Sequence, residues 1–546
     1  MPAVENPTRA ATRMSVATFT SRGIGFVRVF AIAAILGTTY LGNTYQSSAS
    51  VSNVLFELLA AGALSAVLVP TFVSFLEGGE KRRAEDLAGG MLGLGLLAMG
   101  VVSVIGMILA PQIARLLSSG APTQEISDQQ VHLATFWLYF FIPQVCFYVV
   151  GTVATGLLFA KRQYVITAVA PIANTVFVVA SLVVFWLVAG TEPGLDLTLT
   201  EKWILGIGGL LGVIGYVGVP VVGALRAGFR FRPSLRVRDP DVRRMLKLSA
   251  WAVFQHGGVG VLLLASIVMG NQVAGGVVAY QFAFVAFLAP YAILAEPIQA
   301  TTLTEVSLDA ARGDLAAFAD RVRWALNTTA MLVLPVSAAL VALAKPMMEV
   351  IAVGDNRADL YAAALGSLGI GLFTYCTFLL LARCSYALGD SRTPALVAFA
   401  TAAIGALSMV VAGLLVRDGA AKVVVLGLGH SLAYFLGTVV MWIVLRRRLR
   451  QPLFPHMLWR ALGLSVLLGG GAWLVVHLLS PNGRVPTFAT LAMVGLVGGG
   501  AYFVMLRLLP KRVPAGEAGL DVGPIEAASL EPVEPVEPDV VGDLDL

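Results

Sequence analysis

The sequence predicts an all-α polytopic membrane protein. Hydrophobic residues make up 58% of the 546 positions and charged residues only 13%, whereas a soluble domain is about half apolar and about one quarter charged. The mean hydropathy is +0.83. The apolar residues form about fourteen runs, each long enough for the roughly 20 residues that span a hydrocarbon core as a helix. The alternation with a period of two that marks a membrane barrel is absent from these runs.

Each apolar run is expected to form a membrane-spanning helix, because backbone polar groups in lipid must be paired within their own segment. A hydropathy window moved along the chain gives fourteen expected spans. They lie at residues 14–37, 46–76, 88–117, 130–159, 165–190, 203–226, 247–270, 274–302, 324–345, 358–388, 394–416, 422–445, 458–480 and 486–509.

The first twelve spans are expected to form two lobes of six helices in a parallel pseudo-repeat. The segment LLFAKRQYVITAVAP at 157–171 resembles LLLARCSYALGDSRTP at 379–394, and each ends one span and enters the next. Two such halves around a central cavity are a common transporter plan. The expected organisation is an N-terminus at 1–13, an N-lobe at 14–226, a basic linker at 227–246, a C-lobe at 247–445, two further spans with their preceding basic loop at 446–509, and a tail at 510–546.

Positive charge in alternate loops predicts the orientation. Lysine and arginine gather near 81–83, 161–162, 226–244 and 446–450 and are sparse in the intervening loops. The positive-inside rule places the rich loops in the cytoplasm, and an even number of spans places both termini there too. These loops carry no nucleic-acid-binding motif, so anionic lipid is the expected partner of their charge.

The tail at 510–546 differs in character from the rest of the chain. It is acidic, rich in proline and poor in aromatic residues, a composition typical of disorder. We expect a disordered cytoplasmic tail, which could bind cell-wall enzymes.

Two arginines stand inside the first apolar run. Arg22 and Arg28 lie in MSVATFTSRGIGFVRVFAIAAILG at 14–37. An arginine at membrane depth costs at least about 2.5 kcal/mol and normally faces a cavity, a partner or a ligand. Its planar fork of donors suits phosphate. We expect at least one of the two to face an anionic ligand; the alternative is a structural ion pair with Glu57.

Five further polar residues in or beside the apolar runs are candidates for lining a substrate cavity. Asn174 follows Pro171 in APIAN, where a kink is expected. His256 stands in the seventh span, the counterpart of the first, and could titrate or bind a polar headgroup. The remaining candidates are Asn43, Asn53 and Glu57.

No enzyme motif is visible. The sequence contains no GxxxxGK[ST] phosphate loop, no HExxH and no GxSxG. Cys146, Cys376 and Cys384 all fall within expected spans, which argues against a disulfide framework or a zinc site. We therefore expect a transporter that performs no covalent chemistry, and the sequence indicates no catalytic residue, metal or cofactor.

Four strings resemble a known family in sequence and in order. They are SRGIGFVR at 21–28, LGNTYQSSASVSNVLFELLAAGALSAVLVPTF at 41–72, GLLFAKRQYVITAVAPIANT at 156–175 and ARCSYALGDSRTP at 382–394. Together they resemble the MurJ/MviN family of lipid II flippases, within the multidrug/oligosaccharidyl-lipid/polysaccharide exporter superfamily. The resemblance extends over roughly residues 14–510.

The resemblance implies a substrate and a mechanism. The substrate would be lipid II, an undecaprenyl pyrophosphate that carries a disaccharide-pentapeptide and serves peptidoglycan and cell-wall synthesis. The protein would lie in the bacterial cytoplasmic membrane and would move this lipid from the inner to the outer leaflet by alternating access. Arg22 and Arg28 would take the roles of the family's first-span arginines, and the last two spans would hold the prenyl tail.

The chain departs from the family pattern at several cavity positions. It has Asn43 where the family often has an acidic residue, and Phe56 where many members have arginine. The eighth span reads YQFAFVAFLAP at 280–290, without the arginine that many members carry there. Two alternatives therefore stay open: an exporter of drugs or of another lipid-linked glycan, and a non-transporting scaffold that recruits cell-wall enzymes.

Overall fold

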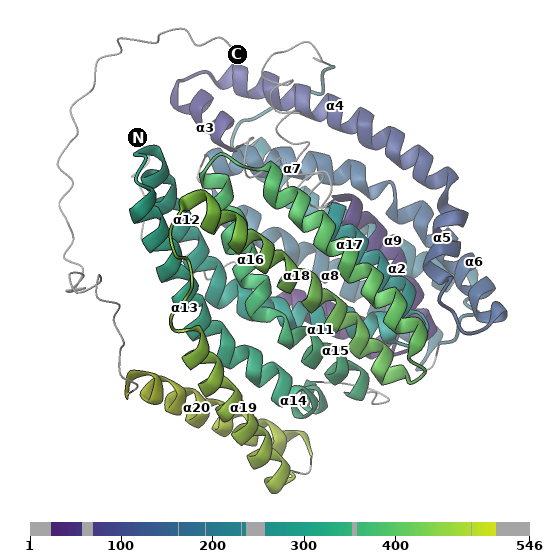
Figure 1. Cartoon of the computed structure of the whole chain (residues 1–546). Helices are drawn as coiled ribbons and strands as arrows, with labels where there is room; N and C mark the ends of the chain where they lie inside the picture. The colour runs from purple at the N-terminus through teal and green to yellow at the C-terminus, as the bar shows by residue number, and fades with distance from the viewer. Residues whose placement is uncertain are drawn as a thin grey trace.

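The computed structural model describes residues 23–56, 69–161, 163–191, 193–230, 232–235, 257–351, 358–481 and 483–508. Every regular element within these ranges is helical, which confirms the predicted fold class (Figure 1). The helices in the N-terminal half are Gly23–Ile35, α2 (Tyr40–Phe56), α3 (Val69–Glu77), α4 (Lys81–Ile108), α5 (Ala110–Ser118), α6 (Gln124–Phe141), α7 (Gln144–Ala160), α8 (Tyr164–Ala189) and α9 (Leu199–Arg226).

The C-terminal half follows the same all-helical pattern. Its elements are Gly257–Gly270, α11 (Gly276–Pro290), the π-helical turn η3 (Tyr291–Ala295), α12 (Glu296–Ala311), α13 (Leu315–Ala342), α14 (Ala344–Ile351), α15 (Ala358–Ile370), α16 (Leu372–Ala387), α17 (Arg392–Leu415), α18 (Gly419–Leu449), α19 (Leu458–Leu479) and α20 (Arg484–Leu508). α11, η3 and α12 follow one another as a single apolar segment.

Ten helical segments are long and apolar enough to cross a membrane, and the bent pair α15–α16 would make eleven. The break between α15 and α16 bends the pair by 46°. The shorter helices Gly23–Ile35 and Gly257–Gly270, together with α2 and α3, occupy the other three expected spans and border parts of the chain that the structure does not describe. The polytopic prediction is therefore confirmed, while the count of fourteen is not established.

The helices pack as two groups that meet along α2 and α11 (Figure 1). In the first group α9 packs along α8 and α7, and α6 packs on α2 and α5. In the second group α18 is central and contacts α15, α16 and α17. Each group has its own apolar core: one surrounds Trp137 and Phe185, and the other surrounds Phe287 and Leu365.

The last two helices lie outside both groups. α19 packs on α13, and α20 packs on α19 and α14. Close packing of neighbouring helices accounts for only one glycine in the runs at 469–471 and 498–500. A Cβ at Gly469 would lie 3.1 Å from the Ala338 side chain, whereas a Cβ at 470, 471 or 498–500 would have no atom within 4 Å. Large apolar residues such as Leu478 and Leu496 are exposed on this pair, as on a surface that faces lipid.

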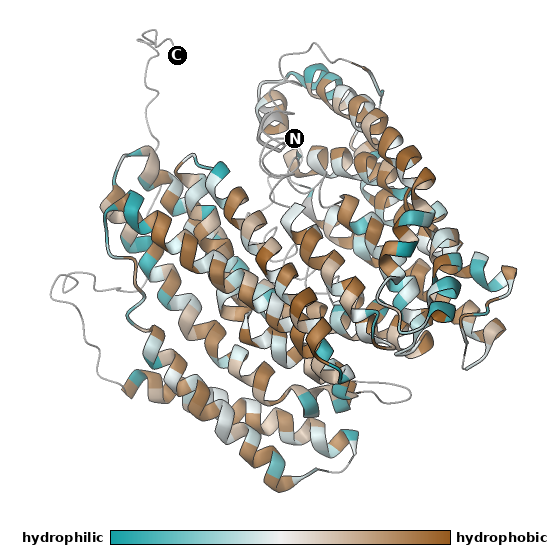
Figure 2. Cartoon of the chain, turned by 45° about the vertical axis from the view of Figure 1, so that its right-hand side comes forward, coloured by the Kyte–Doolittle hydropathy of each residue, from teal (hydrophilic) through white to brown (hydrophobic). Residues whose placement is uncertain are grey.

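Local sequence fixes where several helices begin. Thr198 and Glu201 form a capping box at the start of α9, and the side chain of Asp418 accepts a hydrogen bond from the amide of Ala421 at the start of α18. Hydrophilic residues concentrate at helix ends in both groups, while the middles of the helices are apolar (Figure 2). This distribution is expected when the hydrocarbon core covers the middles.

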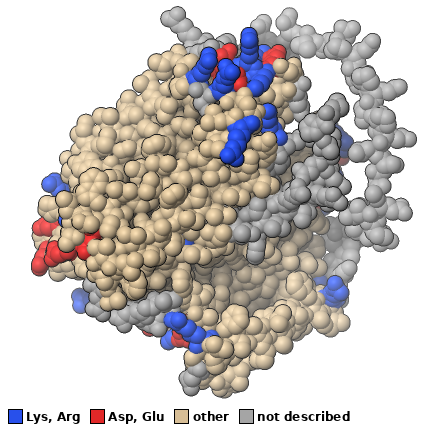
Figure 3. All heavy atoms as spheres, turned by 180° about the vertical axis from the view of Figure 1, so that it is seen from behind, with Lys and Arg blue, Asp and Glu red and all other residues tan. Residues whose placement is uncertain are grey.

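One end of the bundle carries most of the positive charge, and we call it the basic end. It contains Lys81 at the start of α4, Arg226 at the end of α9 and the arginines at 446–448 at the end of α18. Figure 3 shows lysine and arginine gathered at one edge of a surface that otherwise carries few charges. The described parts of the predicted basic loops thus meet at a common end.

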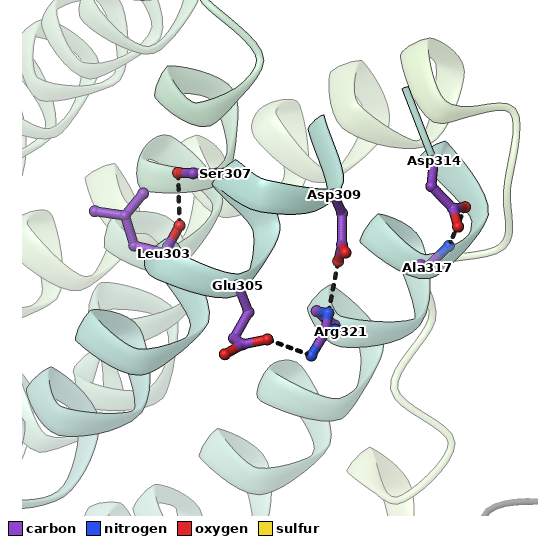
Figure 4. Close-up of polar contacts among 7 residues, drawn as sticks. All are labelled: Leu303, Glu305, Ser307, Asp309, Asp314, Ala317 and Arg321. Carbon is purple, nitrogen blue, oxygen red and sulfur yellow. Dashed lines mark hydrogen bonds and ion pairs between the residues drawn. The ribbon is translucent and has the colours of Figure 1, made fainter. Parts of the chain in front are cut away.

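A compact ion-pair network closes the α12–α13 hairpin at the basic end (Figure 4). The Arg321 guanidinium lies 2.8 Å from Glu305 and donates to the nearly buried Asp309 carboxylate at 2.6 Å. The Asp314 side chain caps α13 through the amide of Ala317. These contacts hold the hairpin rigid, and no ligand needs to be invoked for them.

Candidate functional site

Arg28 lies in the helix Gly23–Ile35 and reaches into the first helical group. Its Nη1 donates to the Asn174 Oδ1 at 2.8 Å, across 146 residues of sequence. Its Nε is buried and has no hydrogen-bond partner. Among the described residues no carboxylate pairs with this half-buried guanidinium. An arginine at membrane depth normally faces a cavity, a partner or a ligand.

A small polar cavity surrounds the Arg28 side chain. It has a volume of about 60 Å³ and is lined from α2 by Tyr45 and Asn53, from α7 by Gln144 and Tyr148, and from α8 by Asn174, besides other residues. None of the described lining residues is an aspartate or glutamate.

Two hydrogen-bond donors in this cavity are left without partners. The Gln144 Oε1 accepts a hydrogen bond from the Ser52 Oγ at 3.4 Å, but the Gln144 Nε2 is buried and unpaired, like the Arg28 Nε. Leaving a buried donor unpaired costs about 1–3 kcal/mol, and more when the group is charged. An arrangement of unpaired donors around one positive charge suits an anion such as a phosphate group.

The backbone of α8 and α9 positions Asn174. Pro171 stands inside α8, and its carbonyl accepts a hydrogen bond from the Thr175 hydroxyl at 3.1 Å, one turn later. Gly212 on α9 faces Asn174: a Cβ there would lie 3.1 Å from the Asn174 Nδ2 and 2.7 Å from Val178. The glycine therefore allows α9 to approach α8 closely enough to fix the amide that holds Arg28.

The two helical groups are joined at the end opposite the basic end, which we call the closed end. Asn43 is fully buried there, and its Nδ2 donates to the Asn271 Oδ1 at 3.2 Å and to the Val273 carbonyl at 2.9 Å. Its Oδ1 accepts from the Val277 amide at 3.1 Å. Asn271 and Gln130 exchange two further hydrogen bonds, of 2.7 and 3.0 Å. Neutral amides from both groups thus seal this end.

A second layer of amides lies along α2 and α11. The Gln281 Nε2 donates to the Ser50 Oγ at 2.9 Å, and the Gln46 Nε2 donates to the Gln281 Oε1. Backbone packing reinforces the seal, because a Cβ at Gly120 would lie 1.9 Å from the Val268 carbonyl oxygen. The closed end is therefore both hydrogen-bonded and tightly packed.

Comparison with known proteins assigns the chain to a family. Residues 32–494 match the family described as lipid II flippase MurJ. The chain belongs to the MurJ family. A probable lipid II flippase MurJ from Rhizobium tropici is 24% identical over 534 residues, with 93% of this chain and 94% of the relative covered. The lipid II flippase MurJ of Burkholderia cenocepacia is 25% identical over 446 residues, with 79% and 83% covered.

Solved structures show the same fold. A lipid II flippase MurJ in an inward closed conformation superposes with a TM-score of 0.69 at 16% identity, with 90% of this chain and 99% of that chain covered. An inward-facing multidrug resistance MATE family transporter of the MOP superfamily gives a TM-score of 0.60 at 14% identity, with 81% and 98% covered. The predicted resemblance to the MurJ/MviN family is confirmed.

Within this MurJ-family fold, the structure brings three of the predicted site residues together. Arg28, Asn53 and Asn174 line the same cavity. Asn43 lies elsewhere: it is buried in the closed end, because its amide can satisfy the polar backbone of 273–277 while pairing with Asn271. The remaining three candidates, Arg22, Glu57 and His256, lie outside the described residues.

Several residues of the site were not predicted from the sequence. They are the glutamines Gln46, Gln130, Gln144 and Gln281, which bond at the closed end or line the cavity. For Gln144 and Gln281 the signal was present, since each is the single amide of an apolar stretch, and polar side chains at membrane depth usually face a partner. What the sequence could not show is which amide meets which.

Proposed function

We propose that the protein is a flippase that moves lipid II from the inner to the outer leaflet of the bacterial cytoplasmic membrane for cell-wall synthesis. The observation that supports this most is the Arg28 cavity, where a positive charge and two unpaired donors converge in a chain of the MurJ family. The diphosphate of an undecaprenyl-linked precursor is an anion of matching chemistry.

The geometry supports alternating access as the way in which the lipid is moved, and the proposal includes no covalent chemistry. A cavity of about 60 Å³ holds a few water molecules or a phosphoryl oxygen, whereas a disaccharide-pentapeptide headgroup needs far more space. The headgroup therefore enters when the helical groups part at the basic end, while the closed end blocks passage. Breaking the amide seal at Asn43 and Asn271 then releases the headgroup on the other side.

The basic end is the cytoplasmic end in this proposal, as the positive-inside rule requires, and both termini lie there. A diphosphate carries net negative charge, and moving one elementary charge across the membrane is worth about 2.3 kcal/mol per 100 mV, so voltage can bias the cycle. The exposed apolar surface of α19 and α20 offers a path for the prenyl tail.

The proposal is tested by depletion of the protein in a strain where it is the sole flippase. Lipid II should accumulate in the inner leaflet, and its exposure to an outer-leaflet degrading enzyme should fall. Re-expression of the wild-type chain should restore the exposure of lipid II to this enzyme, whereas re-expression of Arg28→Ala should not. Normal outward exposure during depletion would rule the proposal out.

Two alternatives are separated by further variants. A cation-coupled drug exporter needs a carboxylate in its cavity, and the described cavity lining contains none. Unchanged drug efflux in Glu57→Gln would argue against that function.

A scaffold acting through its acidic tail predicts that deletion of residues 514–546 abolishes growth while Arg28→Ala does not. The flippase proposal predicts the reverse.

A further inference from the structure

A cluster of aromatic rings encloses His430 in the second helical group. His430 stands on α18 and is 5% exposed. The ring centroids of Tyr434 and Phe284 lie 4.8 and 5.2 Å from its own, and those of Phe287 and Tyr375 lie 5.9 and 6.4 Å away. These rings come from α11, α16 and α18, so three helices meet at one imidazole.

The imidazole has one polar contact and one nitrogen left over. Its Nδ1 lies 3.3 Å from the Tyr280 hydroxyl, whereas its Nε2 is buried and has no partner. A neutral imidazole tolerates this arrangement, because one nitrogen can lack a proton. An imidazolium cannot, since both nitrogens then carry protons that require acceptors.

Counter-charges are missing around His430 on the described helices that pack against α18. The titratable side chains facing it are Tyr280 from α11, Tyr375 from α16 and Tyr434 on α18 itself. Tyr361 of α15 packs on Phe282 instead. On α15 the carboxylate of Asp359, in the first turn of the helix, pairs with Lys345. The charged side chains of α17 and α13 lie near the basic end, at Arg392 and at 320–323, and the helix Gly257–Gly270 carries none. Beyond the cluster, Arg383 of α16 donates to the Tyr291 hydroxyl at 3.4 Å. The described groups around His430 therefore provide no negative charge to balance an imidazolium.

The same turn of α11 connects His430 to the seal between the helical groups. Tyr280 points toward His430, and its neighbour Gln281 bonds to Ser50 and Gln46 of α2. Successive residues of a helix point about 100° apart, so one turn can contact both partners. Movement of α11 at Tyr280 must therefore displace Gln281.

We propose that His430 is a proton-binding site, and that its protonation opens the closed end and so couples flipping to the proton gradient. Protonation forces Nδ1 to donate to Tyr280 and gives Nε2 a proton without an acceptor. α11 must then shift to admit water or an acceptor, and this shift breaks the Gln281 contacts with α2. The π-helical turn η3, which directly follows Pro290, provides a place where the segment can bend.

The coupling role rests on the proposed flippase function, but the opening itself can be measured without any substrate. Spin labels on Gln124→Cys and Arg417→Cys report the distance between the two groups at the closed end, because both positions are exposed there at the starts of α6 and α18. Cys146→Ala removes the more accessible native thiol, since Cys376 and Cys384 are buried. Double electron–electron resonance is recorded from pH 8 to pH 4.5.

The wild-type chain should shift toward longer distances as the pH falls, with the ratio of open to closed states changing by at most about tenfold per pH unit for one proton. His430→Gln and His430→Phe should abolish this dependence. The matched control is His477→Gln, because His477 also stacks on an aromatic ring, Trp473 at 5.2 Å, but lies on α19 outside both groups. It should retain the wild-type response.

Two results would overturn the inference: a wild-type distance distribution that does not change with pH, or a dependence that survives in both His430 variants. A pH-dependent opening in a chain that does not flip lipid II would leave the proton site standing and contradict the proposed function. If the closed end does not open as the pH falls, and lipid II flipping is insensitive to an imposed pH gradient, the proton site is contradicted while the proposed flippase function stands.

Discussion

The two helical groups hold their central polar residues in opposite ways. Around Arg28 the first group provides amides, hydroxyls and a permanent charge, with two donors unpaired. Around His430 the second group provides aromatic rings and a side chain whose charge depends on pH. A permanent charge with spare donors suits the binding of an anion, whereas a titratable group without spare partners suits control. The comparison suggests that one half binds the headgroup and the other half controls the closure.

The largest effect on closure is expected from Gly120→Ala. The added Cβ would meet the Val268 carbonyl oxygen at 1.9 Å, and overpacking of this kind costs about 1–3 kcal/mol. The closed end should open, with the spin-label distance at that end shifting to longer values at neutral pH. Gly100→Ala is the matched control, because a Cβ there has no atom within 4 Å. Equal distance distributions in the two variants would show that the backbone contact does not hold the seal.

A somewhat smaller opening is expected from Asn271→Ala. The change removes the partner of Asn43 and Gln130, and a buried amide left unpaired costs about 1–3 kcal/mol. Asn327→Ala serves as the comparison, since Asn327 bonds to His456 and to the Met457 amide within the second half. Both variants should lower thermal stability, but only Asn271→Ala should change the distance between the halves.

Gln144→Leu separates a binding role from a structural one. Because its Nε2 has no partner in the structure, an apolar side chain of similar size should leave the melting temperature unchanged or raise it slightly. Flipping should nevertheless fall about fivefold, in line with a lost hydrogen bond worth about 1 kcal/mol. A clear drop in melting temperature together with normal flipping would place Gln144 in the framework of the fold instead.

The smallest effect is expected outside both halves. Gly498→Ala on α20 adds a Cβ where no atom lies within 4 Å, and alanine favours helices over glycine by about 1 kcal/mol. Flipping and the closed-end distances should stay at wild-type values. A substantial loss of flipping in this variant would show that α20 needs an open surface at this position, for example for the prenyl tail.

The sequence predicted the fold class well because membrane helices are specified locally. An apolar run of sufficient length must pair its backbone internally, and this requirement holds without any knowledge of its neighbours. The internal breaks were not predicted. The bend of 46° between α15 and α16 and the π-turn at Tyr291–Ala295 interrupt runs that read as continuous, since hydropathy carries little information about backbone geometry within a span.

The candidate site was predicted residue by residue but not as an arrangement. Arg28 and Asn174 each stood out as polar residues in apolar runs, yet their contact across 146 residues depends on how helices pack. Asn43 stood out for the same reason and lies in the seal instead. His430 did not stand out in the sequence, because five rings from three helices gather around it only in the folded bundle.

The most direct test of the binding role of Arg28 is flipping of purified lipid II in proteoliposomes that contain the wild-type chain, Arg28→Ala or Arg82→Ala. A hydrogen bond to a charged group is worth about 1.5–3 kcal/mol, so Arg28→Ala should lower the rate by about 10- to 150-fold. Arg82→Ala, which removes an exposed charge at the basic end, should flip at the wild-type rate. A correctly folded Arg28→Ala protein that flips lipid II as fast as the wild type would contradict the account.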